Sequence, residues 1–130
     1  MRVLIIDIDG TLCGPPPGRD YAACAPHPEV VSRLREYRAQ GFRIVLSTSR
    51  NMRTFEGRVG EIVAKTVPTL IAWLDKHDIP YDEIHVGKPW CGHDGFYVDD
   101  RAVRPDEFAR MDYTEIRALL GLDDTGTGGA

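Results

Sequence analysis

The sequence predicts a Rossmann-type α/β fold, a three-layer sandwich with a central parallel sheet, on three observations. Short apolar runs rich in β-branched residues alternate with segments of helical periodicity, which favours parallel strands joined by helices. The chain has 130 residues, of which 42% are hydrophobic and 28% charged, and this balance is typical of one globular domain. Polar residues follow the apolar runs, at the sheet edge where such folds bind ligands.

The first expected element is a strand over residues 3–8, a continuous apolar run ended by Gly10. Such a run is typical of a strand buried on both faces. Residues 13–28 contain three consecutive prolines and no helical or strand periodicity, so they predict a long irregular loop. Loops of this length are usually functional, and the sequence leaves the role of this one open.

A helix is expected next, because Pro28 suits a first helical turn and Gly41 supplies a stop. Apolar residues at helical spacing form its inner face: Val30, Val31, Leu34 and Tyr37. Residues 44–46 then predict a second buried strand, which leads directly into a polar segment.

Two helices and two strands are expected in the following stretch. A helical segment at 61–65 is interrupted by Pro68, which we place in the first turn of a new helix. That helix carries Leu70, Ile71 and Leu74. Residues 84–86 and 96–98 predict a third and a fourth strand, each followed by charged residues.

The last expected helix covers residues 116–120, and Asp112 and Glu115 ahead of it have the spacing of a capping box. From 123 to 130 the chain is acidic and rich in glycine, which predicts a disordered tail. The expected organisation is therefore a single domain over residues 1–122.

Charge and cysteine usage bear on location and partners. The net charge of -4 argues against a surface that binds nucleic acid or an anionic membrane. Carboxylates interrupt the N-terminal apolar run, so we expect neither a signal peptide nor a membrane span. Cys13, Cys24 and Cys91 form no C-x-x-C pair, which predicts isolated reduced thiols. These features together predict a cytoplasmic protein.

Two acidic pairs follow predicted strands. Asp7 and Asp9 flank one residue at the end of an extended segment, so their carboxylates lie on the same side and favour a cation between them. Alternatively, one of them caps the turn at Gly10. Asp99 and Asp100 offer hard oxygen ligands, which predict Mg²⁺, although a solvated turn with an ion pair is the other interpretation.

Lys88 and Thr48 follow two further predicted strands. A lysine there can balance an aspartate and a phosphate, and a threonine can offer a hydroxyl and an amide to a phosphoryl oxygen. Each residue alone also fits a surface charge or a strand-end hydrogen bond. Their appearance in one order along the chain favours the functional interpretation.

With these motifs, the chain resembles the haloacid dehalogenase (HAD) superfamily of phosphotransferases. The four motifs are matched by Asp7-Ile8-Asp9-Gly10-Thr11-Leu12, Thr48, Lys88 and the pair Asp99 and Asp100. Ser47 is an adjacent candidate for the second motif. A narrower resemblance is to small HAD proteins associated with capsule or surface-polysaccharide biosynthesis. It is carried by residues 51–57, 59–60, 73–74, 79–83, 87–89 and 97–103.

The resemblance implies a phosphatase that acts through an aspartyl-phosphate. Asp7 is then the nucleophile, and Asp9 protonates the leaving oxygen and later activates water. Thr48 and Lys88 complete the catalytic set, and Mg²⁺ is held by Asp7, the main-chain carbonyl of Asp9, Asp99 and Asp100. The implied substrate is a sugar phosphate or a related small phosphorylated metabolite, whose identity the sequence leaves open.

The substrate-binding candidates are Gly10, Ser49, Arg50, Asn51 and Arg53. An arginine here is either a solvated loop charge or a fork that pairs with the substrate. The segments between the motifs are too short for a separate cap domain. Because capless members of the superfamily often use a neighbouring subunit as a lid, the resemblance implies a homo-oligomer, a dimer or a tetramer.

Two other functions stay open. A receiver-type signalling domain also combines aspartates, Thr, Lys and Mg²⁺ on an α/β sheet, but in a different order along the chain. A protein with this fold could also bind metabolites without cleaving them. Phosphate release from a monoester separates the enzyme from both alternatives.

Overall fold

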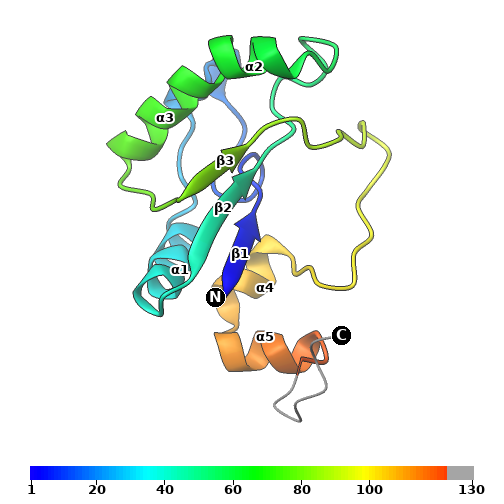
Figure 1. Ribbon diagram of the computed structural model, residues 1–130. Coiled ribbons are helices and arrows are strands. Elements are labelled where there is room, and N and C mark those ends of the chain that lie inside the picture. Colours follow the sequence, from blue (N-terminus) through cyan, green and yellow to red (C-terminus); the bar gives the residue numbers. More distant parts are fainter. Residues whose placement is uncertain (123–130) are drawn as a thin grey trace. The chain divides into compact units, whose positions relative to one another are not determined.

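The computed structural model of the chain describes residues 1–122 (Figure 1). Its residues divide into two compact units, Met1–Trp90 and Cys91–Ala130. The tail predicted for 123–130 lies outside the described residues. No helix within residues 1–122 is both long enough and apolar enough to cross a membrane.

The first unit is built on a parallel sheet, which within residues 1–122 has three strands in the order β1-β2-β3. The strands are β1 (Val3–Ile6), β2 (Arg43–Ser47) and β3 (Glu83–His85). In the register, Leu4 lies opposite Ile44, and Leu46 lies opposite Ile84. The predicted α/β class with a parallel sheet is therefore confirmed, as are its first three strands.

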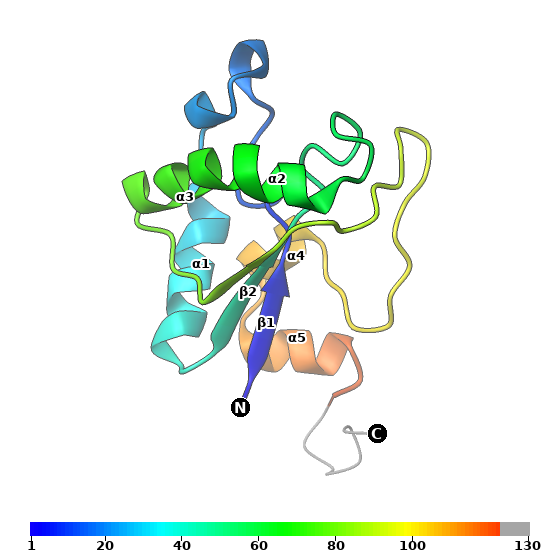
Figure 2. The same cartoon turned by 45° about the horizontal axis from the view of Figure 1, so that its top comes forward.

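Three helices of this unit flank the strands (Figures 1 and 2). They are α1 (Pro28–Ala39), α2 (Val59–Lys65) and α3 (Val67–Lys76). As predicted, Pro28 lies in the first turn of α1 and Pro68 in the first turn of α3. Both prolines suit these positions because the first-turn amides have no partner within the helix.

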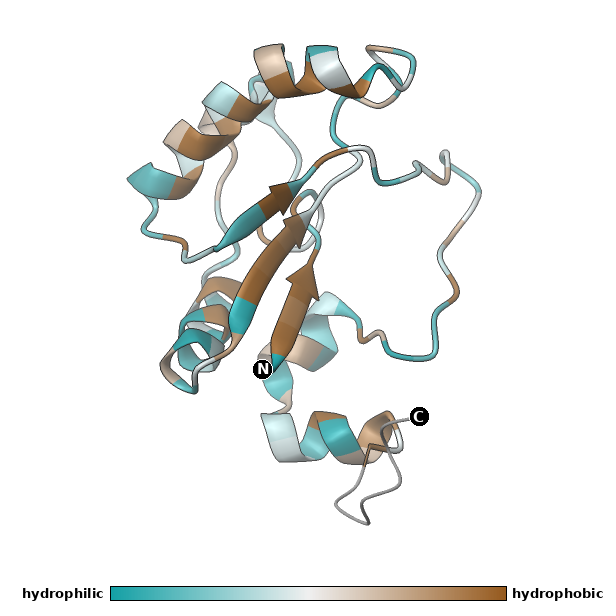
Figure 3. Cartoon of the chain, viewed as in Figure 1, coloured by the Kyte–Doolittle hydropathy of each residue, from teal (hydrophilic) through white to brown (hydrophobic). Residues whose placement is uncertain are grey.

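The core lies between these helices and β2, whose three buried residues, Ile44, Val45 and Leu46, are all apolar. Figure 3 shows the strands as largely hydrophobic. The largest fully buried side chains of the strands and helices are Leu34, Ile44, Leu46, Ile62, Leu70 and Leu74. Trp73 is also buried, whereas Ile71, another apolar residue of α3, is exposed.

The first strand, β1, was expected to be buried on both faces, and this prediction is wrong. Ile6 is buried, but Val3 and Ile5 are exposed. Side chains alternate between the two faces of a strand, so one face of β1 packs into the core and the other does not. Among the described residues, β1 is also an edge strand of this sheet, because it pairs with β2 alone.

Two neighbours on α2 give a matched test of this core. Ile62 has no exposed surface, whereas the Val63 side chain is 52% exposed. We expect Ile62→Ala to lower the free energy of unfolding by about 2–5 kcal/mol, because the truncation leaves a cavity. Val63→Ala should change it by less than about 0.5 kcal/mol, as exposed substitutions usually do. Chemical denaturation of both variants checks this prediction, and equal effects would contradict the packing described.

The second unit contains two helices within its described residues, α4 (Pro105–Arg110) and α5 (Tyr113–Leu119). The capping box predicted ahead of α5 is confirmed. The Glu115 amide donates to Asp112 Oδ1 at 2.9 Å, and the Asp112 amide donates to Glu115 Oε1 at 3.0 Å. Helix α5 begins at Tyr113, directly after this cap and earlier than its apolar residues indicated.

The fourth strand predicted at 96–98 is not formed, and this prediction is wrong. Phe96 and Val98 are 80% and 88% exposed, and the segment makes no strand pairing within the described residues. A strand needs a partner for its backbone groups, and three residues of high β-propensity do not supply one. Helix α4 was not predicted, although Pro105 in its first turn is a typical helix start.

Candidate active site

The candidate site lies at the carboxyl ends of the three parallel strands in the first unit. Asp7 follows β1, Thr48 follows β2, and Lys88 follows β3. Directly after Asp7 the chain turns sharply, and Gly10 adopts a φ of 82°, which favours glycine. The Ile8 carbonyl accepts the amides of three residues of this turn: Thr11, Leu12 and Cys13. The turn therefore fixes the backbone that carries both aspartates of the first motif.

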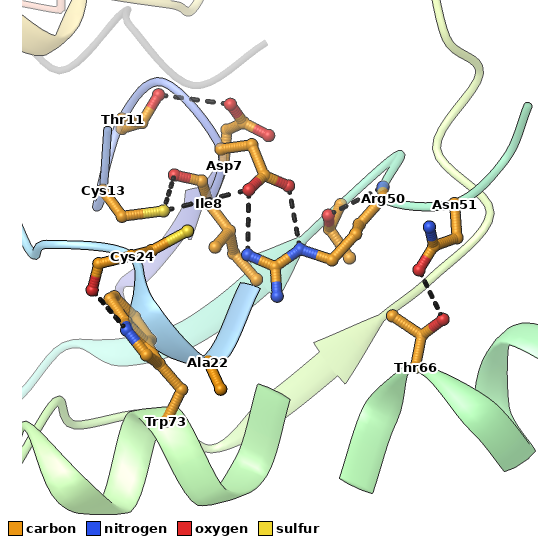
Figure 4. A network of polar contacts seen from close by, with 12 residues as sticks. Asp7, Ile8, Thr11, Cys13, Ala22, Cys24, Arg50, Asn51, Thr66 and Trp73 are labelled. Atoms are coloured by element: carbon orange, nitrogen blue, oxygen red, sulfur yellow. Dashed lines mark hydrogen bonds and ion pairs between the residues drawn. The ribbon is translucent and has the colours of Figure 1, made fainter. Parts of the chain in front are cut away.

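Asp7 is half-buried and has a hydroxyl and a cation beside it. Thr11 Oγ1 donates to Asp7 Oδ2 at 3.2 Å, as Figure 4 shows. Lys88 Nζ lies 3.6 Å from Asp7 Oδ1. The structure thus brings together Asp7 and Lys88, which are far apart in the sequence. A carboxylate next to a lysine in a partly exposed position can approach a phosphate with its own charge offset.

Asp9 has a different neighbour, the side chain of Arg50. Arg50 Nε donates to Asp9 Oδ2 at 3.0 Å, and Arg50 Nη2 donates to Asp9 Oδ1 at 2.8 Å. The Arg50 side chain is only 1% exposed, so it is not a solvated loop charge. Burial lowers the pKa of Arg50, but the hydrogen bonds and charge of Asp9 outweigh that effect and raise the pKa overall.

Thr48 is buried and links the ends of two strands. Its hydroxyl accepts the Arg50 amide at 3.0 Å, its amide donates to the His85 carbonyl at 2.9 Å, and its carbonyl accepts the Lys88 amide at 3.2 Å. These bonds hold the backbones of Arg50 and Lys88 on either side of Thr48. The adjacent candidate, Ser47, is the last residue of β2 and is half-buried.

The other substrate-binding candidates lie on the segment after Thr48. Asn51 has a φ of 62°, and its side-chain oxygen accepts the Thr66 hydroxyl at 2.7 Å, which ties this loop to the start of α3. Ser49 is half-buried. Arg53 is exposed, and its guanidinium lies 5.8 Å from the centre of the Trp90 ring.

The loop over residues 13–28 is more ordered than its composition suggested. It contains two short 3-10 turns, Pro17–Arg19 and Tyr21–Ala23. Trp73 Nε1 of α3 donates to the Cys24 carbonyl at 2.9 Å, and the His27 amide donates to the Leu12 carbonyl at 2.7 Å. These bonds attach the loop to α3 and to the turn of the first motif.

Tyr21 of this loop covers Arg50. The Arg50 guanidinium lies 4.2 Å from the centre of the Tyr21 ring, a cation–π arrangement. Burial, together with the charge of Asp9, raises the pKa of the Tyr21 phenol. Sequence patterns did not single out Tyr21, because its only distinguishing feature is a contact with a residue far along the chain.

The thiol of Cys13 is a second neighbour of the Asp9 carboxylate. It donates to Asp9 Oδ1 at 3.8 Å and to the Ile8 carbonyl at 3.7 Å. Burial, followed by the charge of Asp9, raises the pKa of Cys13 to about 12. The residue is therefore a protonated donor at neutral pH and a poor nucleophile. Cys13, Cys24 and Cys91 are all free thiols.

The predicted acidic pair of the second unit, Asp99 and Asp100, is exposed. The Arg101 amide donates to Asp99 Oδ1 at 2.9 Å, which is a local turn of the kind typical of aspartate. Within residues 1–122, no three side chains of His, Cys, Asp or Glu are grouped so as to hold a metal ion.

Comparison with known proteins places the chain beside a solved structure. No family model and no curated protein matches the chain. The chain is similar to the crystal structure of a structural-genomics target from Vibrio cholerae, with 56% sequence identity and a TM-score of 0.87. The similarity covers 93% of this chain and 98% of the Vibrio cholerae chain, and the description of that protein names no function.

Proposed function

We propose that this chain, which belongs to the same family as the Vibrio cholerae protein, is a phosphomonoester hydrolase of the HAD type. The proposed reaction depends on Mg²⁺, passes through an aspartyl-phosphate, and acts on a sugar phosphate or a related small metabolite. One observation supports it above all others. Asp7 lies beside Lys88, at the carboxyl ends of parallel strands and next to the turn that carries Asp9.

The proposed chemistry assigns each of these groups a task. An Asp7 oxygen attacks phosphorus, the bond from phosphorus to the ester oxygen breaks, and Asp9 gives a proton to the departing oxygen. Water then attacks the aspartyl-phosphate while Asp9 takes a proton from it, and this releases inorganic phosphate and restores Asp7. Lys88 offsets the repulsion between the Asp7 carboxylate and the phosphate.

The donor set is chemically suited to Mg²⁺. All the proposed ligands are oxygens, which Mg²⁺ prefers: the carboxylates of Asp7, Asp99 and Asp100 and the main-chain carbonyl of Asp9. When bound, Mg²⁺ would neutralise charge on the phosphoryl oxygens. The assignment of Asp99 and Asp100 rests on the sequence motif, because they belong to the second unit.

The same proposal covers the finer features that the resemblance implies. They are an HAD-like three-layer sandwich without a separate cap domain, a cytoplasmic location, an association with polysaccharide biosynthesis, and a homo-oligomeric state. The Thr48 hydroxyl would donate to a phosphoryl oxygen, whereas the amides of Thr48, Gly10 and Thr11 already donate to backbone carbonyls.

A panel of phosphomonoesters tests the proposed function. We expect the purified chain with Mg²⁺ to release inorganic phosphate catalytically from at least one sugar phosphate, nucleotide or small phosphoester. A receiver-type domain would instead retain a phosphoryl group after a single event, and a metabolite-binding protein would shift its melting temperature with a ligand but release no phosphate. Either of those results would contradict the proposal.

A further inference from the structure

Arg50 is a buried cation to which the proposed reaction gives no task. Its side chain is 1% exposed, and two of its nitrogens donate to the two carboxylate oxygens of Asp9. Burying a guanidinium is costly unless it is paired and hydrogen-bonded. A buried arginine is therefore stable only with a paired acceptor. Here the acceptor is Asp9, the residue proposed to donate and accept the proton.

The geometry of this pair restrains Asp9 in a specific way. A planar guanidinium that donates to both oxygens fixes the plane of the carboxylate as well as its position. The Asp9 side chain is nevertheless 35% exposed, so solvent and a substrate can still reach it. A carboxylate has about four lone-pair directions, and the two hydrogen bonds from Arg50 and the one from the Cys13 thiol leave one for a proton.

Two further contacts hold the arginine itself in place. The Tyr21 ring covers the guanidinium at 4.2 Å, and the Arg50 amide donates to the buried Thr48 hydroxyl at 3.0 Å. Tyr21 belongs to the loop that Trp73 attaches to α3. The proline-rich loop thereby contributes to the environment of Asp9 through Arg50.

We propose that Arg50 is a positioning residue that orients Asp9 for proton transfer, with Tyr21 packing it in place. This inference rests on the proposed function. It differs from a direct contact between Arg50 and the substrate, because the same donors cannot form a bidentate pair with Asp9 and with a substrate group at once.

The expected consequence of removing Arg50 is a loss of activity whose size depends on the leaving group of the ester. Nitrophenolate departs without a proton, whereas an alkoxide requires one from a general acid. If Arg50 acts through Asp9, its removal should slow hydrolysis of glycerol phosphate much more than hydrolysis of p-nitrophenyl phosphate. If Arg50 instead contacted the substrate directly, the loss of kcat/KM would be largest for esters whose alcohol part carries groups that can bind an arginine, whatever the leaving group's basicity.

The experiment compares kcat/KM for p-nitrophenyl, phenyl and glycerol phosphates in the wild-type chain and in a set of variants. The set contains Asp9→Asn, Arg50→Gln, Arg50→Lys, Tyr21→Leu and the double variant Asp9→Asn/Arg50→Gln. The matched control is Arg58→Gln, because Arg58 is exposed and pairs with Glu56 and Glu61 at the surface.

We expect Arg50→Gln to lose about tenfold or more on glycerol phosphate and less than about threefold on p-nitrophenyl phosphate, with partial recovery in Arg50→Lys. The double variant should be no slower than Asp9→Asn, because both changes act at one step. A loss that is equal for all three esters, or effects of Asp9→Asn and Arg50→Gln that multiply, would overturn the inference. Arg58→Gln should match the wild type.

Two further measurements keep the inference testable if a variant or the activity fails. If Arg50→Gln does not fold by circular dichroism, Tyr21→Leu should show a smaller loss with the same dependence on the leaving group, and a uniform loss would overturn the inference. If the wild-type chain hydrolyses no ester, the proposed function fails instead. The coupling of Arg50 to Asp9 is then judged from the melting temperatures of the single and double variants, where additive shifts would overturn it.

Discussion

Replacing Asp7 by Asn is expected to abolish phosphate release while leaving the fold intact. Asp7 is half-buried, and its contacts with Thr11 and Lys88 are polar, so an amide of the same shape fits the position. An amide cannot supply the oxygen nucleophile that forms an aspartyl-phosphate. We expect kcat/KM to fall by about 10³-fold or more on every ester, including those with good leaving groups.

The matched control for this variant is Asp75→Asn, an exposed aspartate on α3 that should leave kcat/KM unchanged. Mass spectrometry of the Asp7→Asn protein after the assay excludes deamidation back to aspartate. Substantial turnover by an intact Asp7→Asn chain would contradict the nucleophile assignment. A loss confined to poor leaving groups would contradict it as well, because that pattern belongs to the proton-transferring residue.

Removal of Mg²⁺ should have an effect of similar size. We expect excess EDTA to reduce phosphate release to background, a loss of about 10³-fold or more, and added Mg²⁺ to restore it. The physical reason is that one lysine, Lys88, cannot by itself offset the charges of a phosphate dianion and of the acidic groups proposed around it. Phosphate release is measured before and after the addition of each reagent.

Variants of the second unit refine this metal prediction. Asp99→Asn should raise the Mg²⁺ concentration for half-maximal activity by about tenfold or more, because it removes a proposed carboxylate ligand. Asp94→Asn, a change at another exposed aspartate of the same unit, should not alter that concentration. Full activity in excess EDTA would remove the metal from the mechanism, and equal effects of the two variants would remove Asp99 from the ligand set.

The elements that the sequence predicted well are those with strong local signals. Continuous apolar runs marked β1 and β2, Pro28 and Pro68 marked two helix starts, and Asp112 with Glu115 marked a cap. Each signal acts within a few residues, so it can be seen in a single sequence. The predicted strand at 96–98 had the right composition, but strand formation also depends on pairing with a distant segment.

In the candidate site, too, residues with local sequence signals could be predicted and long-range contacts could not. Alternation along the first strand and the ends of later strands led to Asp7, Asp9, Thr48 and Lys88, because parallel strands bring their carboxyl ends to one edge. The partner of Arg50 could not be predicted, since its contacts with Asp9 and Tyr21 join three separate segments of the chain. The order of the proline-rich loop likewise depends on Trp73, far along the sequence.

The central claim is that a phosphoryl group is transferred to Asp7 and then to water. Acid-quenched samples taken during turnover of the best ester from the panel, reduced with borohydride and digested, show by mass spectrometry which carboxylate carried an acyl phosphate. We predict modification at Asp7, formed faster than the steady-state rate and absent in Asp7→Asn. Steady turnover with Asp7 unmodified at every time point, or modification at another carboxylate, would contradict the claim.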